Sequence, residues 1–189
     1  ITEFLHFAGD NNGVFTLNSF DAGLRDNMVP ESATAIFTAD STLAELQEKL
    51  TAYTTAENLT AELTQEGDAF RLTVVGKSAH GSTPELGING ATYLAKFLNQ
   101  FAFEGAAKAY LEIAANVLHG DFAGENLGVA YTDEKMGALS MNAGVFKFDR
   151  NSDDNTITLN FRYPQGTDAQ TIKAELEKLN GVTKVTLSD

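Results

Sequence analysis

The chain contains no cysteine and no tryptophan, and only three of its residues are histidine. Without cysteine it can form no disulfide framework, thiolate nucleophile or cysteine-based zinc site. The same absence is typical of a reducing compartment, so we expect a cytoplasmic protein. His6, His80 and His119 stand far apart, and none lies in an H-E-x-x-H or H-x-x-E-H pattern. We therefore expect this chain to bind no zinc with its own residues.

Basic residues are also scarce, because 13 Lys and Arg stand against 26 Asp and Glu and leave a net charge of −13. Nucleic acids and anionic membrane surfaces need basic patches, so we expect neither as a partner. No segment reaches the roughly 18 consecutive apolar residues of a membrane span. The first residues lack the charged region of a signal peptide. Because the chain starts with Ile1 instead of Met, we expect it to be cut from a longer protein.

The residues that are abundant indicate a folded protein with a real core. Apolar residues make up 43% of the 189 residues, and 13 of them are phenylalanine. Such a composition argues against disorder. The length suits one domain or two small lobes.

The first third of the chain predicts one strand and one helix after an irregular start. The first thirty residues are rich in Gly, Asn and Asp, and we expect them to be irregular with one strand at most. A strand is expected over residues 29–38. Thr42 and Glu45 have the spacing of a capping box, which predicts a helix start. Apolar residues follow at helical spacing: Leu43, Leu46, Leu50 and Tyr53.

The middle third predicts a hairpin followed by two helices. Residues 59–77 alternate between apolar and polar side chains on both sides of a polar turn, which is typical of an antiparallel hairpin with one covered face. Helices are expected over 91–101 and 106–118, the second closed by His119 and Gly120. We expect residues 120–137, with their glycines, to form a loop.

The last third predicts a second hairpin, a helix and a strand. Its strands are expected at 138–148 and 156–163, joined by a polar turn at 149–155. Residues 167–170 have the form of a second capping box, and the helix is expected to end at Gly181.

The order of these elements predicts an α+β fold, with two lobes of antiparallel sheet covered by helices and a ferredoxin-like βαββ order in each half. We place the first lobe at residues 1–120 and the second at 121–189.

One stretch of the chain has residues suited to chemistry, Gly76-Lys77-Ser78-Ala79-His80-Gly81-Ser82-Thr83-Pro84-Glu85. The histidine follows a strand directly, and Gly81 permits close approach of another group. Pro84 and Glu85 suit the start of a helix. The simpler interpretation is a polar strand-to-helix loop with an incidental surface histidine.

Two further polar residues could likewise be either functional or incidental. Asn27 lies just before the strand that follows Pro30, where a turn asparagine is the simpler interpretation. Arg162 ends a strand and points away from Phe161, and it is one of only four arginines. Its simpler interpretation is a surface arginine paired with one of the many acidic residues.

These three places together resemble a known enzyme family. G-K-S-A-H-G-S-T-P-E-L-G-I-N-G-A-T-Y-L at residues 76–94 is similar to the signature of the smaller domain in the co-catalytic zinc peptidases and deacylases. N-M-V-P-E at 27–31 resembles that family's N-x-V-P-[DE] motif, and N-F-R-Y-P at 160–164 resembles its R-x-P strand end. H-G-D-F-A-G-E-N-L-G at 119–128 and M-N-A-G-V at 141–145 are closer still to the PepV-type dipeptidases.

The resemblance implies that the chain is a lid domain, inserted into a catalytic domain that carries two zinc ions and the general base. It implies that His80 donates a hydrogen bond to the substrate carbonyl oxygen in the transition state. It implies that Asn27 is a second polar contact and that Arg162 binds the C-terminal carboxylate of a dipeptide. The partners implied are the dipeptide and the catalytic domain of the same chain, and this part alone is expected to be inactive and to bind no zinc.

Two alternatives stay open at this point. The chain could be the dimerisation domain of a related deacylase or carboxypeptidase. It could also be a free-standing α+β interaction module whose ligand the sequence does not identify.

Overall fold

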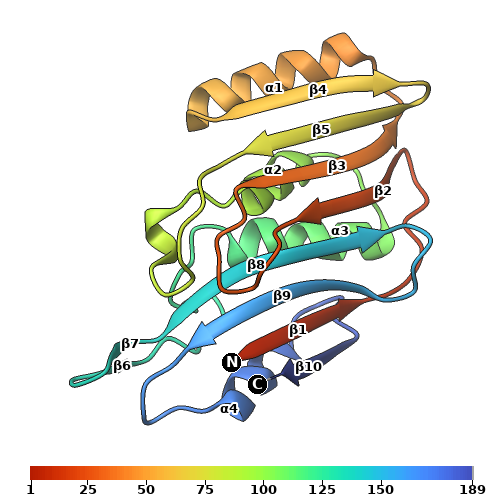
Figure 1. Ribbon diagram of the computed structural model, residues 1–189. Helices are drawn as coiled ribbons and strands as arrows, with labels where there is room; N and C mark the ends of the chain where they lie inside the picture. The colour runs from red at the N-terminus through yellow and green to blue at the C-terminus, as the bar shows by residue number, and fades with distance from the viewer. Residues whose placement is uncertain (189) are drawn as a thin grey trace.

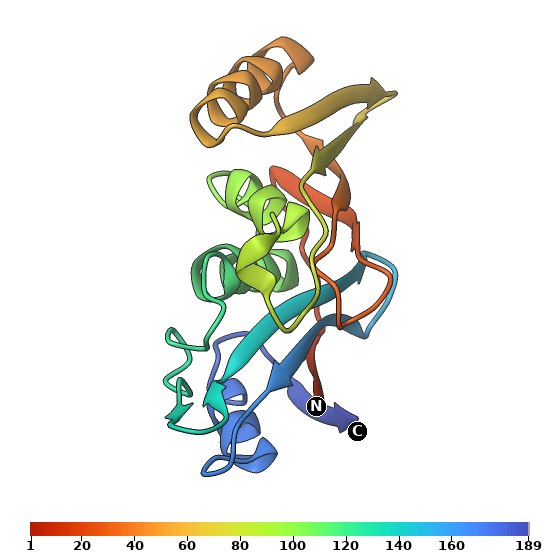
Figure 2. The same cartoon turned by 60° about the vertical axis from the view of Figure 1, so that its left-hand side comes forward.

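A computed structural model describes residues 1–188, which form an eight-stranded antiparallel sheet and a small two-stranded one. The strands of the large sheet lie in the order β10-β1-β9-β8-β2-β3-β5-β4 (Figure 1). Figure 2 shows the four α-helices on one side of this sheet. The strands are β1 (Thr2–Phe7), β2 (Phe15–Ala22), β3 (Ser32–Ala39), β4 (Thr60–Glu66), β5 (Ala69–Val75), β6 (Thr132–Asp133), β7 (Gly137–Ala138), β8 (Ser140–Asp149), β9 (Asn155–Arg162) and β10 (Lys184–Ser188). The helices are α1 (Leu43–Glu57), η1 (Pro84–Leu86), α2 (Gly90–Leu98), α3 (Gly105–Glu112), η2 (Ile113–Leu118) and α4 (Ala169–Leu176).

The core lies between the sheet and its helices. In the central strands alternate residues point toward the helices and are buried, as Phe70, Leu72 and Val74 of β5 illustrate. The opposite face of the sheet is mostly polar, and there Thr34 and Thr73 join β3 to β5 through their hydroxyl groups, 2.9 Å apart. The predicted α+β class is confirmed by this arrangement. No helix among residues 1–188 is long and apolar enough to cross a membrane.

The helix ends follow the expected capping chemistry only in part, because α4 has another capping residue and ends at Leu176, not at the expected Gly181. The Thr42 hydroxyl accepts a hydrogen bond from the Glu45 N–H at 3.2 Å, so α1 begins where predicted. At α4 the capping residue is Asp168, whose carboxylate accepts from the Thr171 N–H at 2.8 Å, and not Thr167. The helix expected over residues 106–118 is present and begins as α3, but its last turns, η2, are a π-helix. It ends before Gly120, whose φ of +76° favours glycine.

The expectation of an irregular start with one strand at most is wrong, because the first thirty residues contain both β1 and β2. Glu3 of β1 is buried on the helix-facing side, where an apolar residue is expected, so it conceals the alternation. In β2 the register shifts between Leu17 and Ser19, which is a β-bulge that breaks the period of two. Two local irregularities thus removed the signal on which the prediction depended.

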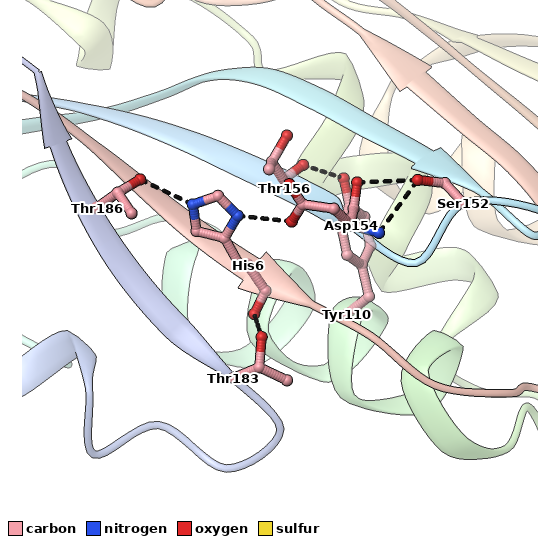
Figure 3. A network of polar contacts seen from close by, with 7 residues as sticks. All are labelled: His6, Tyr110, Ser152, Asp154, Thr156, Thr183 and Thr186. Atoms are coloured by element: carbon pink, nitrogen blue, oxygen red, sulfur yellow. Dashed lines mark hydrogen bonds and ion pairs between the residues drawn. The ribbon is translucent and has the colours of Figure 1, made fainter.

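His6 belongs to the packing of β1 and not to the functional motifs. Its Nδ1 lies 2.6 Å from Asp154 Oδ1, and its Nε2 lies 2.8 Å from Thr186 Oγ1 (Figure 3). The imidazole therefore connects β1 to the turn between β8 and β9 and to the edge strand β10. Tyr110 of α3 donates to the Thr156 carbonyl oxygen at 2.8 Å in the same region.

The large sheet consists of two four-stranded halves that pair within one chain. β2 and β8 are antiparallel, with Ser19 opposite Asp149 and Ala22 opposite Phe146. β1 lies between β9 and β10, so the N-terminal strand belongs to the half formed by C-terminal residues. The lobe limits of 1–120 and 121–189 stay a prediction.

Candidate functional site

Two loops lie side by side where β3 and β5 adjoin the 23–31 and 76–89 segments, and they carry two of the three candidate residues (Figure 1). The 23–31 loop connects β2 to β3, and the 76–89 loop connects β5 to α2. Gly81 N–H donates to the Asn27 carbonyl oxygen at 2.6 Å, and Val29 N–H donates to the Ala79 carbonyl oxygen at 2.8 Å. These two backbone hydrogen bonds fix the loops against each other.

Glycine is required at position 81 by this contact. A Cβ atom there would lie 2.9 Å from the Asn27 carbonyl oxygen, which is too close for a side chain. The close approach predicted for the glycine beside His80 is therefore made by the loop that carries Asn27.

His80 is exposed, and its ring has a defined hydrogen-bonding direction. Nδ1 accepts from the Ser82 N–H at 3.1 Å and lies 2.7 Å from the Ser82 hydroxyl. A nitrogen that accepts from a backbone N–H carries no proton of its own, which assigns the proton of the neutral ring to Nε2. Nε2 contacts no polar atom of residues 1–188 at hydrogen-bonding distance, so this N–H is available as a donor.

Asn27 is half-buried in a turn, and its side chain is not fully satisfied. Its Oδ1 is buried and has no hydrogen-bond partner among residues 1–188. A turn asparagine was the simpler interpretation of the sequence, and the position does lie in a turn. The backbone carbonyl of the same residue holds the 76–89 loop, so Asn27 and His80 are neighbours through the main chain.

Arg162 lies at the end of β9, on an exposed surface. Its side chain forms no ion pair with an acidic residue in the described part of the chain, so the simpler interpretation of a paired arginine finds no partner there. It shares the polar face of β9 with Asn160, which contacts the carboxylate of Asp26 at 3.1 Å. Arg162 is therefore on the same sheet face as the 23–31 loop, but within residues 1–188 no hydrogen bond joins it to His80 or Asn27.

Beneath the 23–31 loop lie residues that the sequence did not single out as candidates. Asn142 of β8 donates to the carbonyl oxygens of Asp26 and Met28 at 2.8 and 2.9 Å. The Asp26 carboxylate accepts from the Asn160 amide and the Thr2 hydroxyl. The only sequence signal was the M-N-A-G-V text at residues 141–145, which carried a resemblance but no role.

Two cavities adjoin the loops. One of about 560 Å³ lies beside the 23–31 loop and is lined by residues of both loops and of the adjoining strands β2 and β3, among them Asp21, Leu24, Met28 and Ser78. Burial raises the pKa of the Asp21 carboxyl, and the neighbouring Lys147 partly offsets this. A second cavity of about 210 Å³ lies between the start of α2 and the start of β8. Neither cavity is lined by His80, Asn27 or Arg162, so the three candidate residues lie outside both cavities.

The residues described here do not fit a zinc site. Among residues 1–188 there is no group of three or more His, Cys, Asp and Glu side chains placed to hold a metal ion. His119, which lines the smaller cavity, lies 2.9 Å from the Thr92 hydroxyl through Nδ1 and packs edge-on against Tyr93. Burial lowers its pKa, so this histidine is neutral near pH 7.

The arrangement offers hydrogen-bond donors and a positive charge on the surface of residues 1–188. His80 supplies an N–H, Asn27 an amide, and Arg162 a guanidinium whose planar fork matches a carboxylate. Such groups can donate hydrogen bonds to a carbonyl oxygen and pair with a carboxylate.

Comparison with known proteins finds a matching peptidase domain family and similar dipeptidases. A family profile described as a peptidase dimerisation domain matches residues 68–184. The Beta-Ala-Xaa dipeptidase of Lactobacillus delbrueckii subsp. lactis is 33% identical over 185 residues, which cover 97% of this chain and 39% of that protein. A provisionally named dipeptidase of Staphylococcus haemolyticus is 29% identical over 151 residues, covering 80% of this chain and 32% of that protein. The chain thus spans about a third to two fifths of the length of these relatives.

Proposed function

Because the chain belongs to the peptidase dimerisation domain family, we propose that it is the lid domain of a zinc-dependent dipeptidase. The observation that carries this proposal is the pairing of the two loops, which leaves the exposed His80 imidazole beside the backbone of Asn27. The zinc ions and the general base would belong to a catalytic domain in a longer chain, consistent with the share of the relatives that this chain covers. A cytoplasmic location is part of the same proposal.

His80 would act on the carbonyl oxygen of the scissile peptide bond. Negative charge develops on this oxygen in the transition state, and a fixed N–H aimed at it stabilises that charge. The Ser82 N–H holds Nδ1 as an acceptor, so Nε2 is kept as the donor. Asn27 would add a second polar contact from the same loop pair.

Arg162 would bind the free C-terminal carboxylate of the substrate. The guanidinium is exposed and has no acidic partner among residues 1–188, so its charge is available to a ligand. A bidentate guanidinium–carboxylate pair would restrict the enzyme to short peptides whose C-terminus lies close to the scissile bond. Closure of the lid would exclude water from the site.

The test of His80 uses the full-length protein with a dipeptide substrate. His80→Ala should lower kcat by about 10²- to 10³-fold, the usual effect of removing one such donor, with zinc content unchanged. His80→Gln restores an N–H at similar reach and should recover part of the loss. A nearly normal kcat for His80→Ala would remove this residue from the mechanism.

The test of Arg162 compares a dipeptide with its C-terminally amidated analogue. Arg162→Ala should raise KM for the free acid and leave the already poor amide unchanged, because only the acid offers a carboxylate to the guanidinium. Arg150→Ala is the matched control, since Arg150 lies in the turn after β8 and bonds to Asn12. Equal losses on both substrates would contradict the carboxylate role.

A dimerisation domain of a related deacylase or carboxypeptidase is the second candidate, favoured by the description of the matching family. Against it stands the pairing of β2 with β8, which joins two four-stranded halves inside one chain. The mass of the full-length protein from light scattering, measured with its activity, separates the two. An active monomer supports the lid, and activity confined to a dimer supports the alternative.

A further inference from the structure

Asn142 is a buried polar residue at the point where the 23–31 loop crosses β8. Its side chain is 2% exposed, although it lies on the polar face of the sheet, because the loop covers it. Its amide donates two hydrogen bonds, to the carbonyl oxygens of Asp26 and Met28 at 2.8 and 2.9 Å. These carbonyls flank Asn27 on both sides, so one side chain holds the backbone on either side of a proposed substrate contact.

The strand beneath the loop is shaped to accept it. The register of β8 against β9 shifts between Ala143 and Val145, which makes Gly144 the extra residue of a β-bulge. A Cβ atom at Gly144 would lie 2.5 Å from the Asp26 carbonyl oxygen, so only glycine permits this approach. Asn160 adds a hydrogen bond to the Asp26 carboxylate at 3.1 Å. The bulge and the two asparagines thus seat the loop in one position.

The position of His80 depends on the same seat. The Asn27 carbonyl accepts from the Gly81 N–H, and Val29 N–H donates to the Ala79 carbonyl, so His80 is flanked by both bonds. A shift of the backbone at Asn27 would therefore move the imidazole as well. No other side chain donates to the backbone carbonyls of residues 26–28 within the described part of the chain.

We propose that Asn142 is a positioning residue that sets the geometry of both Asn27 and His80 toward the substrate. The proposal rests on the proposed function, because it concerns the same site. The alternative is that Asn142 only satisfies buried carbonyl groups and contributes to stability alone.

The kinetic test uses the full-length protein. Asn142→Asp keeps the shape of the side chain but turns a carboxylate toward the two carbonyls in place of the amide donor. A displacement near 1 Å of catalytic groups can cost about 10²-fold, so we expect kcat/KM for a dipeptide to fall about 10²-fold, with kcat also reduced. Asn11→Asp is the matched control, since Asn11 is 3% exposed and its amide donates to the Leu17 carbonyl away from the loops.

The second readout does not depend on activity. Hydrogen exchange of the Val29 and Gly81 amides reports the two bonds between the loops. In Asn142→Asp, which removes both hydrogen bonds to the 23–31 loop, these amides should exchange at least about tenfold faster, while amides of β9 keep their rates. In Asn11→Asp the two amides should exchange as in the wild type. Asn142→Ser, whose hydroxyl can serve one carbonyl, provides an intermediate variant if the aspartate does not fold.

The outcomes separate this proposal from the proposed function. Loss of activity together with local loosening of the loops supports the positioning role. Normal kinetics or unchanged exchange of Val29 and Gly81 in a folded Asn142 variant overturns it, even when Asn27→Ala and His80→Ala are impaired. If Asn27→Ala and His80→Ala both have normal activity, the proposed function has failed. An Asn142 variant with loosened loops but normal turnover overturns the positioning role.

Discussion

Glu3 carries a carboxyl group into the core, and its removal should stabilise the protein in a strongly pH-dependent way. It lies on β1 beneath α4, it is 0% exposed, and neither carboxylate oxygen has a hydrogen-bond partner among residues 1–188. Burial raises its pKa from 4.5 to about 7, against the opposing effect of the Lys173 ammonium. A group in this state favours folding only while it is protonated.

The size and sign of this stability change follow from the linkage between proton binding and folding. A folded pKa above the unfolded value means that the folded state binds the proton more tightly, so stability is fully present below pH 4.5 and is lost as the pH rises toward 7. A difference of about 2.5 units, at 1.36 kcal/mol for each, corresponds to about 3 kcal/mol at pH 8. Glu3→Gln keeps the shape and cannot ionise, so it should be more stable than the wild type by about 3 kcal/mol at pH 8 and by less than about 1 kcal/mol at pH 5.

Urea unfolding at pH 5 and pH 8 measures this difference, with the slope checked so that midpoints can be compared. Glu48→Gln on the exposed side of α1 is the control, because it removes the same charge without burial. If Glu3→Gln and the wild type change in parallel between the two pH values, Glu3 does not titrate in the core and the reasoning is refuted.

Three further substitutions should be measured by the same unfolding method. Asp121→Ala removes a carboxylate that accepts four backbone N–H bonds in the loop after η2, so a loss of about 3 kcal/mol is expected; a loss below about 1 kcal/mol would show that the loop does not depend on it. Thr42→Ala removes the cap of α1 and should cost about 1 kcal/mol, whereas no change would mean that the cap is not formed. Leu50→Ala opens a cavity under α1 and should cost about 2–5 kcal/mol, and a smaller effect would contradict its burial.

Local patterns predicted the elements whose two faces differ clearly. The hairpin of β4 and β5 was recognisable because Phe70, Leu72 and Val74 alternate with polar residues without interruption. The first strand was not, since Glu3 occupies a helix-facing position that its neighbours Leu5 and Phe7 share. Periodicity reports the average face of a segment, so one buried acid in six residues is enough to hide a strand.

The order of strands in the sheet lay beyond local patterns for a different reason. β1 lies between β9 and β10, and most of its paired residues are more than 150 positions away in the sequence. Such long-range pairing leaves no mark in either segment alone. Helix starts, in contrast, depend on a few adjacent residues, and at α4 only the choice of Asp168 over Thr167 differed. The end of α4 at Leu176, before the expected Gly181, was not predicted.

Motifs identified His80, Asn27 and Arg162 as candidates, and the structure brings the first two together through the main chain. The support beneath them could not be recognised in the same way. Asn142 acts on backbone carbonyls more than 110 residues earlier, and a carbonyl has no sequence signature. Contacts from a side chain to a distant backbone can therefore be recognised only in the folded structure.

The most direct test of the lid proposal is dipeptide hydrolysis measured in parallel for the full-length protein, its His80→Ala variant and this 189-residue chain alone. The proposal predicts zinc-dependent turnover by the full-length protein, a decrease of about 10²- to 10³-fold in kcat for the variant, and none by the chain alone. Turnover by the isolated chain, or full activity in His80→Ala, would contradict it.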